Sequence, residues 1–218
     1  MDRFITVKGV AQISAPADTV VLEMTLQSRH KKYERCMTVA AEKKSRLEEI
    51  IVSAGFQTND IKTKYFNIAP DYAEKCQNNT YHQVFDCWEC EHELLLHFPF
   101  DSQRLHQVLS LLSSSDCDCV LSLDFTVADK TAVQEKLLAE AALNARKKAE
   151  VLSNAMNCKL GQLLNINYNW QDINIFSTSR FRYTRPQRLP MASQSRACSM
   201  RPDNISVEDS AEFIWELI

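Results

Sequence analysis

The stretch TAVQEKLLAEAALNARKKAEVLSNAM, residues 131–156, decides the fold that this sequence predicts. Apolar residues recur in it at steps of mostly four, which is the period of an α-helix, and they are Val133, Leu137, Ala141, Ala145, Ala149, Leu152 and Met156. We predict that Thr131 and Gln134 start the helix as a capping box and that Asn157 ends it in the left-handed conformation. Because three small alanines in mid-helix let two backbones approach closely, we predict that this helix lies flat on a sheet.

The remaining segments show strand and helix patterns in turn. Residues 4–13 and 20–26 alternate between apolar and polar side chains, and we predict that a turn at 15–18 joins them into an antiparallel hairpin. A helix over 31–54 ends at Gly55, and Asp101 caps another helix. Residues 59–63 lead into a strand that ends at 68, and a loop over 70–72 and 74–80 follows it. We predict four further strands, over 81–98, 119–127, 163–168 and 205–217.

This order, ββ-α-ββ-α-β-α-ββ, indicates an α+β fold with antiparallel or mixed sheets and helices packed on one face. We expect a single module over residues 1–218 that consists of two subdomains. The outer subdomain comprises 1–58 and 129–218, and an inserted ββαβ subdomain comprises about 59–128.

Length and composition are typical of a globular protein. A chain of 218 residues buries roughly 70% of its unfolded surface, so its core needs neither disulfides nor metal. The formal net charge of −3 gives no overall sign of nucleic-acid binding. No apolar run reaches the ~18 residues of a membrane helix, and the N-terminus lacks the apolar core of a signal peptide. We therefore expect a cytoplasmic protein, and the alternative is an exported one whose signal peptide has been removed.

Eight cysteines are the main chemical candidates, and they are Cys36, Cys76, Cys87, Cys90, Cys117, Cys119, Cys158 and Cys198. The motifs CWEC at 87–90 and CDC at 117–119 resemble the two halves of a four-thiolate zinc site. The second spacing is one residue too short, and the strand period points Cys87 and Cys90 to opposite faces unless a bulge intervenes. We therefore expect scattered reduced thiols, with a zinc site or a redox pair as the alternative.

Other residue types offer no catalytic arrangement. The five histidines form no helical metal pair, and we expect His92 to be a hydrogen-bonded residue of the core face. Glu89, Glu91 and Glu93 share one strand face, where we expect them to be hydrated. Three isolated glycines exclude a glycine-rich phosphate loop. The sequence predicts no catalytic, cofactor-binding or metal-binding residues, and we do not expect an enzyme.

Residues 172–203 differ from the rest of the chain in charge. They contain six arginines, no lysine and two aspartates, so their net charge is +4 and the remainder carries −7. Phe176, Phe181 and Tyr183 are interleaved with the arginines. We expect a flexible surface loop, and the alternative is a basic, aromatic surface for RNA or another polyanion.

Several short stretches together resemble the SIMPL-domain family over nearly the whole chain. They are ITVKGVA at 5–11 with APAD at 15–18, AG at 54–55 with DIKT at 60–63, PDY at 70–72, SLDFTVAD at 122–129, EA at 140–141 with ARKKAE at 145–150, LG at 160–161 and ISV at 205–207. The DIKT and ARKKAE pieces are the more specific ones when taken together. Asn157 stands where a glycine is usual in the family, and 172–203 is rich in arginine rather than in proline and alanine.

The resemblance implies a two-part α+β fold without established catalytic residues. It also implies a link to oxidative stress, as in bacterial envelope-associated relatives, one of which resembles a ring-forming, channel-like oligomer. The animal relative is named for binding a kinase of innate immune signalling.

Three functions follow as hypotheses. The first is a non-enzymatic binding or assembly protein that forms homo-oligomers, has an unidentified protein partner and is linked to stress or signalling; its long strands could pair with a neighbour. The second is a cysteine-based redox or metal-linked stress protein. The third is a module that binds RNA or another polyanion through 172–203, and we do not expect nucleic acid as the main partner.

Overall fold

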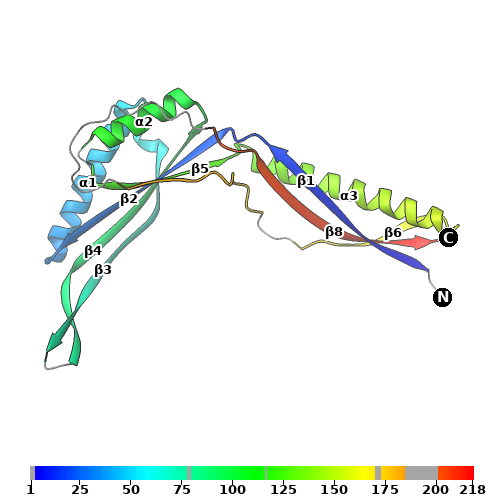
Figure 1. Cartoon of the computed structure of the whole chain (residues 1–218), viewed down its shortest axis with the longest axis horizontal. Coiled ribbons are helices and arrows are strands. Elements are labelled where there is room, and N and C mark those ends of the chain that lie inside the picture. The colour runs from blue at the N-terminus through cyan, green and yellow to red at the C-terminus, as the bar shows by residue number, and fades with distance from the viewer. Residues whose placement is uncertain (1–2, 78–79, 116, 170–172, 185–200) are drawn as a thin grey trace. The chain divides into compact units, whose positions relative to one another are not determined.

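The computed structural model describes residues 3–77, 80–115, 117–169, 173–184 and 201–218 (Figure 1). In chain order its elements are β1 (Phe4–Ala15), β2 (Thr19–His30), α1 (Tyr33–Ser53), the 3₁₀ turn η1 (Thr58–Asp60), β3 (Ile61–Gln77), β4 (Thr80–Pro99), α2 (Ser102–Ser114), β5 (Cys119–Thr126), α3 (Lys130–Ala155), β6 (Leu160–Asn167), β7 (Phe181–Thr184) and β8 (Ile205–Leu217). The predicted α+β class and the order of the long elements are confirmed. The short strand β7, which lies in the segment predicted to be a loop, was not predicted.

The chain divides into two compact units. The first comprises Met1–Ala17, Thr126–Thr178 and Asp203–Ile218, and the second comprises Asp18–Phe125 and Ser179–Pro202. The sequence analysis assigned β2 and α1 to the outer subdomain, whereas they lie in the second unit together with β3, β4 and β5.

The first unit is a three-stranded antiparallel sheet of order β1–β8–β6 with α3 packed on it (Figure 1). β1 pairs with β8 without interruption from Phe4 opposite Glu216 to Ala15 opposite Ile205. The predicted hairpin between β1 and β2 is therefore wrong, because β2 pairs with β4 in the other unit. β1 instead pairs over its whole length with β8, and α3 packs on both strands, so burial against α3 rather than nearness in the chain decides the pairing.

The alanine stripe of α3 packs on this sheet as predicted. Ala141, Ala145 and Ala149 are buried, and Ala145 and Ala149 lie in a core cluster with Val7, Ala211, Phe213 and Trp215 of β1 and β8. Gly9 lies opposite the stripe. A Cβ atom at Gly9 would lie 2.1 Å from the carbonyl oxygen of Ala141 and 2.8 Å from the Cβ atom of Ala145. Helix and strand therefore approach each other as closely as their backbones allow.

Polar side chains of α3 also reach the backbone of β1. The Val10 N–H donates to Asn144 Oδ1 at 3.1 Å, and Lys148 Nζ donates to the Lys8 carbonyl at 3.1 Å. Because β1 is an edge strand, these bonds occupy backbone groups that a strand of another molecule would otherwise pair with.

The ends of α3 differ in part from the prediction. The helix begins at Lys130, and Asp129 Oδ1 accepts from the Ala132 N–H at 2.8 Å, so the cap is Asp129 rather than the Thr131–Gln134 box. An aspartate at this position serves the first turn as well as threonine does and adds a favourable charge at the helix N-terminus. Asn157 has the predicted left-handed conformation, with φ of 54°. The prediction that Leu152 and Met156 belong to the apolar face is wrong, because they are 49% and 75% exposed. Steps of four from Ala149 lead instead to Ser153, which is buried.

The second unit is a five-stranded sheet of order β3–β4–β2–β5–β7 with α1 and α2 on the same side of it (Figure 1). β2 pairs with β4 from Thr19 opposite Pro99 to His30 opposite Trp88. The large side chains that are fully buried in this unit include Leu22, Met24 and Leu26 of β2, Leu47 and Ile51 of α1, Leu94 and Leu96 of β4, Leu105 of α2 and Phe125 of β5. Gly55 ends α1 with φ of 88°, and Asp101 caps α2 by accepting from the Gln103 and Arg104 amides, both as predicted.

The loop predicted over 70–72 and 74–80 is wrong in its described part. β3 runs to Gln77, and its pairing with β4 includes Asp71 opposite Cys87 and Tyr72 opposite Phe85. Pro70 is compatible with the strand because β3 is an edge strand, where a missing N–H need not break the sheet.

Tyr168, directly after β6, ties this end of the first unit to β8. Its hydroxyl donates to Asp209 Oδ2 at 2.6 Å. This hydrogen bond, together with burial and the charge of Asp209, raises the pKa of Tyr168 to about 12.

We predict that Ala145→Leu lowers the free energy of unfolding by about 1–3 kcal/mol, because overpacking a close contact has this cost. The control is Arg146→Leu, one residue along on the exposed side, where the guanidinium pairs with Glu150 at 3.0 Å. The control should lose less than about 0.5 kcal/mol. Denaturant melts compare the two, and an equal or larger loss for the arginine variant would mean that the faces of α3 are misassigned.

We predict that Gly9→Ala destabilises the protein by at least about 1–3 kcal/mol, since the new methyl group would meet the backbone of Ala141, which cannot rotate away. Lys8→Ala, at the exposed neighbouring position, should change the free energy of unfolding by no more than about 0.5 kcal/mol. Thermal and urea melts provide the measurement. A Gly9→Ala protein as stable as the wild type would contradict the close approach of α3 to β1.

A third prediction concerns alkaline pH. The folded-state pKa of Tyr168 lies above its ordinary value of 10, so the neutral phenol stabilises the fold below about pH 10, and this contribution is lost as pH rises through about 12. Tyr168→Phe should therefore cost about 1 kcal/mol at neutral pH, and its difference from the wild type should shrink above pH 10. Urea melts of both proteins across this range measure the difference, and a constant difference would contradict the prediction.

Candidate functional site

The hairpin of β3 and β4 extends beyond the rest of its sheet (Figure 1). β2 pairs with β4 only over residues 88–99, whereas β3 pairs with β4 as far as Gln77 opposite Thr80. Residues 71–77 and 80–87 therefore form a ribbon of two strands, which we call the arm. A two-stranded ribbon is at best marginally stable in water, so further contacts are needed to hold it.

A β-bulge near the base of the arm decides which side chains share a face. Asp71 lies opposite Cys87 and Tyr72 opposite Phe85, so Asp86 is an extra residue on β4. Because the extra residue shifts the alternation by one, Phe85 lies on the same face as Trp88, Cys90 and His92. The bulge thus continues the inner face of β4 into the arm.

Aromatic rings follow this face from α1 outward. Tyr33, at the start of α1, meets Trp88 edge to face with ring centroids 5.2 Å apart. Trp88 contacts Phe85 at 6.0 Å, and Phe85 contacts Tyr72 of β3 at 6.2 Å. We call these four rings the aromatic ladder. Cys36 and Ala40 of α1 pack against Cys90, with Trp88 and Ile68 at the margin of the cluster, so the covered part of the face ends near Trp88.

The outer part of the ladder is exposed. Phe85 is 42% and Tyr72 52% exposed, and Tyr81, which shares the face of Phe85 further along β4, is 72% exposed. Edge-to-face aromatic pairs normally form in buried surroundings and are worth about 0.5–1.5 kcal/mol beyond their buried area. Uncovered rings gathered in this way make this face of the arm a candidate interaction surface.

The opposite face of the arm carries a cluster of charged groups. Potential ligand atoms of Asp71, Asp86 and Cys87 lie within 4.8 Å of one another. Arg29 lies beside them, with its guanidinium 3.5 Å from Asp71 and 2.9 Å from Glu89. Burial, and then the charges of Asp86 and Asp71, raise the pKa of the Cys87 thiol. A protonated thiol and an adjacent guanidinium both oppose metal binding, so the cluster is better explained as an ion-pair network.

The structure places the cysteines of the two motifs in different surroundings. Cys87 and Cys90 point to opposite faces of β4, as the strand period predicted. Cys90 packs in the core cluster with Cys36, whose thiol donates to the backbone carbonyl oxygens of Ser28 and Trp88. Asp71, Asp86 and Cys87 form the sole metal-ligand cluster found in the described part of the chain, so the two motifs do not meet in a four-thiolate zinc site there.

The expectation for His92 is confirmed. It is buried, its Nε2 lies 3.2 Å from Thr63 Oγ1, and it meets the Phe66 ring edge to face at 5.0 Å. Burial lowers the pKa of His92, and the charge of Lys44 lowers it further. We predicted that Glu89, Glu91 and Glu93 are simply hydrated, and this is wrong for two of them. Glu89 forms an ion pair with Arg29, and Glu93 forms one with Lys64 at 3.1 Å.

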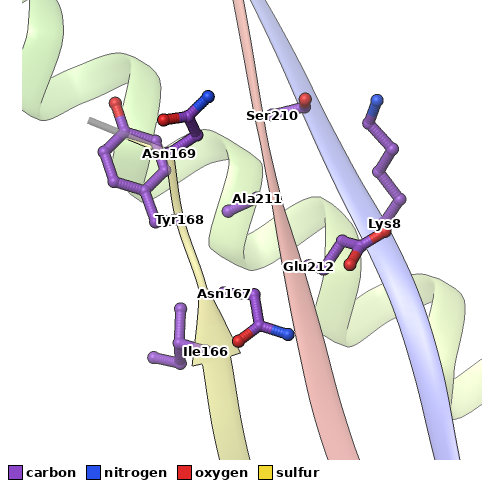
Figure 2. A pocket seen from close by; sticks show the side chains of 8 residues that line it. All are labelled: Lys8, Ile166, Asn167, Tyr168, Asn169, Ser210, Ala211 and Glu212. Atoms are coloured by element: carbon purple, nitrogen blue, oxygen red, sulfur yellow. The ribbon is translucent and has the colours of Figure 1, made fainter. Parts of the chain in front are cut away.

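A groove of about 560 Å³ lies in the first unit beside the end of β6 (Figure 2). It is lined by Lys8, Ile166, Asn167, Tyr168, Asn169, Ser210, Ala211 and Glu212. Lys8 and Glu212 lie opposite each other in the pairing of β1 with β8, so their charges offset one another. The groove therefore has no net charge with which to attract an ionic ligand, and it does not form our candidate site.

The arginine-rich segment is described in part. Arg180 pairs with Asp124 of β5 at 3.1 Å, and Arg182 belongs to β7, which pairs with β5. The Arg180 guanidinium is thus used within the second unit. Arg185, Arg188 and Arg196 lie outside the described residues, and so do most of the positions on which the polyanion hypothesis depends.

Comparison with known proteins identifies the family. The sequence profile of the SIMPL family, described as "Protein of unknown function (DUF541)", matches residues 5–215. No curated protein matches the chain. In the described residues, α1, α2 and α3 each lack an apolar stretch long enough to cross a bilayer. Because the profile match spans nearly the whole chain and both structural units, the chain belongs to the SIMPL family.

Proposed function

We propose that this chain is a non-enzymatic binding and assembly protein, and that copies of it associate through the aromatic ladder of the arm. The observation that carries the proposal is the exposure of Phe85, Tyr72 and Tyr81 on a ribbon that, among the described residues, no third strand supports. Near the sheet, α1 covers the same face of β4. In the assembly, an apolar surface of a second molecule covers the outer rings of the ladder, as α1 covers the inner ones.

The sheet edge itself suits pairing less well than the face does. Pro70 offers no N–H along the outer edge of β3, and the register of β3 shifts at Lys64 and again opposite Asp86. Proline and bulges at an edge are features that oppose the addition of another strand. We therefore propose contact through side chains of the ladder face rather than through the backbone of the edge.

Covering the exposed rings would supply part of the free energy that association needs. An aromatic side chain has roughly 200 Å² of surface, so covering the exposed half is worth about 2.5 kcal/mol per ring before the cost of association. In a dimer with two-fold symmetry each residue of the ladder takes part twice. Aromatic residues also dominate the energetically important centres of protein interfaces.

The test compares oligomeric state across a concentration series by light scattering. The wild type should be larger than a monomer, and Phe85→Ser should weaken the association at least about tenfold, which corresponds to 1.4 kcal/mol. Its matched control is Val84→Ser, the adjacent residue on the opposite face, which is 38% exposed and should leave the association unchanged.

Two results would contradict the proposal. One is a wild-type protein that stays monomeric at every concentration. The other is an equal effect of Phe85→Ser and Val84→Ser. Urea melts should show that Val84→Ser keeps the wild-type stability within about 0.5 kcal/mol. Phe85→Ser loses its ring contacts with Tyr72 and Trp88, so it should lose about 1–3 kcal/mol and still be folded under the conditions of the light-scattering experiment.

A further inference from the structure

Two buried thiols meet where the chain passes from α2 into β5. Cys117 and Cys119 flank the exposed Asp118, and the Cys119 N–H donates to the Cys117 carbonyl oxygen at 3.1 Å, which closes a three-residue turn. Two Cα–Cα steps of about 3.8 Å folded in this way bring the Cα atoms into the range of roughly 4.4–6.8 Å that a disulfide spans. As whole residues, Cys117 and Cys119 are 7% and 6% exposed, so a small solute reaches them more easily than a protein does.

The surroundings of Cys117 favour its thiolate. The Cys119 S–H donates to the Cys117 sulfur, and this hydrogen bond lowers the pKa of Cys117. Burial and the charge of Asp118 act in the opposite direction, while Lys43 and Arg46 of α1 lower the pKa. Burial raises the pKa of the Cys36, Cys87 and Cys90 thiols, which are therefore kept as unreactive thiols.

We propose that Cys117 and Cys119 form a dithiol–disulfide couple that reacts with hydroperoxides. The Cys117 thiolate attacks one oxygen of hydrogen peroxide, the O–O bond breaks, and with one proton taken up the products are the Cys117 sulfenic acid and water. The Cys119 sulfur then attacks the Cys117 sulfur, the S–O bond breaks, and a second water leaves as the disulfide forms. In sum, two thiols and one peroxide give one disulfide and two waters. This inference is independent of the proposed assembly function.

The loop that this disulfide would close is too short for a stabilising role. The stabilisation that a cross-link provides through the unfolded state grows with loop length, and a bridge across one intervening residue is near the lower limit. Strained, short-loop disulfides are also reduced more readily than structural ones. The pair is thus suited to reversible oxidation.

The test uses the full chain, reduced and then treated with hydrogen peroxide at low molar excess. Remaining thiols are alkylated, and peptides are analysed by mass spectrometry. The expected result is loss of both thiols in the peptide that holds Cys117 and Cys119, through an internal disulfide that a dithiol reductant reverses. Two outcomes would overturn the proposal: both thiols stay reduced while other cysteines such as Cys158 are oxidised, or Cys117 is oxidised without bonding to Cys119.

Variants assign the two roles. Cys119→Ser should leave a sulfenic acid on Cys117 that a sulfenic-acid probe traps, whereas Cys117→Ser should give no adduct at Cys119. Lys43→Gln should shift the pH–rate midpoint of the oxidation upward, because it removes a charge that favours the Cys117 thiolate. Arg35→Gln, on the same helix but without such an effect on Cys117, is its control and should leave the midpoint unchanged. An equal shift for both lysine and arginine variants would contradict the assigned role of Lys43.

Discussion

The first unit depends on the contact between Gly9 of β1 and the Ala141 backbone of α3, which excludes even a methyl group between them. This closeness requires glycine on the strand and alanine on the helix, and it explains a stripe of small residues that would be unusual on an exposed helix. It also has a second consequence. From this position Asn144 and Lys148 of α3 also bond to the backbone of β1, so the same helix packs the core and covers an edge that would otherwise accept a neighbouring strand.

In the second unit, the edge strand β3 is protected in a different way. There β3 is an edge strand that extends beyond its sheet, and it is blunted by Pro70 and by two irregularities of register rather than by a helix. The face of the arm remains uncovered instead. α1 covers Trp88 and Cys90 but not Phe85 or Tyr72, and nothing else in the described part of the chain buries these two rings. A protein that protects the edges of β1 and β3 yet leaves aromatic rings exposed has a surface suited to selective contact through side chains.

Periodicity in the sequence predicted the elements well where one residue pattern controls the structure. The alternation in β4 placed Cys87 and Cys90 on opposite faces, and the alanine steps in α3 identified its buried side. Pairing partners were predicted less well, because the adjacent strands β1 and β2 resemble a hairpin although β1 pairs with β8, some 200 residues away along the chain. The β3 side of the arm was predicted as a loop because Pro70 and the polar residues after it have low strand propensity. Its pairing with β4, which extends to Gln77 and includes the contact of Tyr72 with Phe85, overrides that preference.

The bulge at Asp86 shows why the candidate site could not be found from local pattern alone. With strict alternation Phe85 would lie on the face of Cys87, beside Asp71 and Arg29, where an aromatic ring would disturb an ion-pair network. The extra residue turns Phe85 to the side of Trp88 and leaves Asp86 and Cys87 together on the other side. One inserted residue therefore separates the arm into a charged face and an aromatic face. An extra residue moves every side chain beyond it to the other face of the strand, but the alternation of residue types does not reveal where such a residue lies. The shift at Asp86 makes the ladder continuous from α1 to the arm.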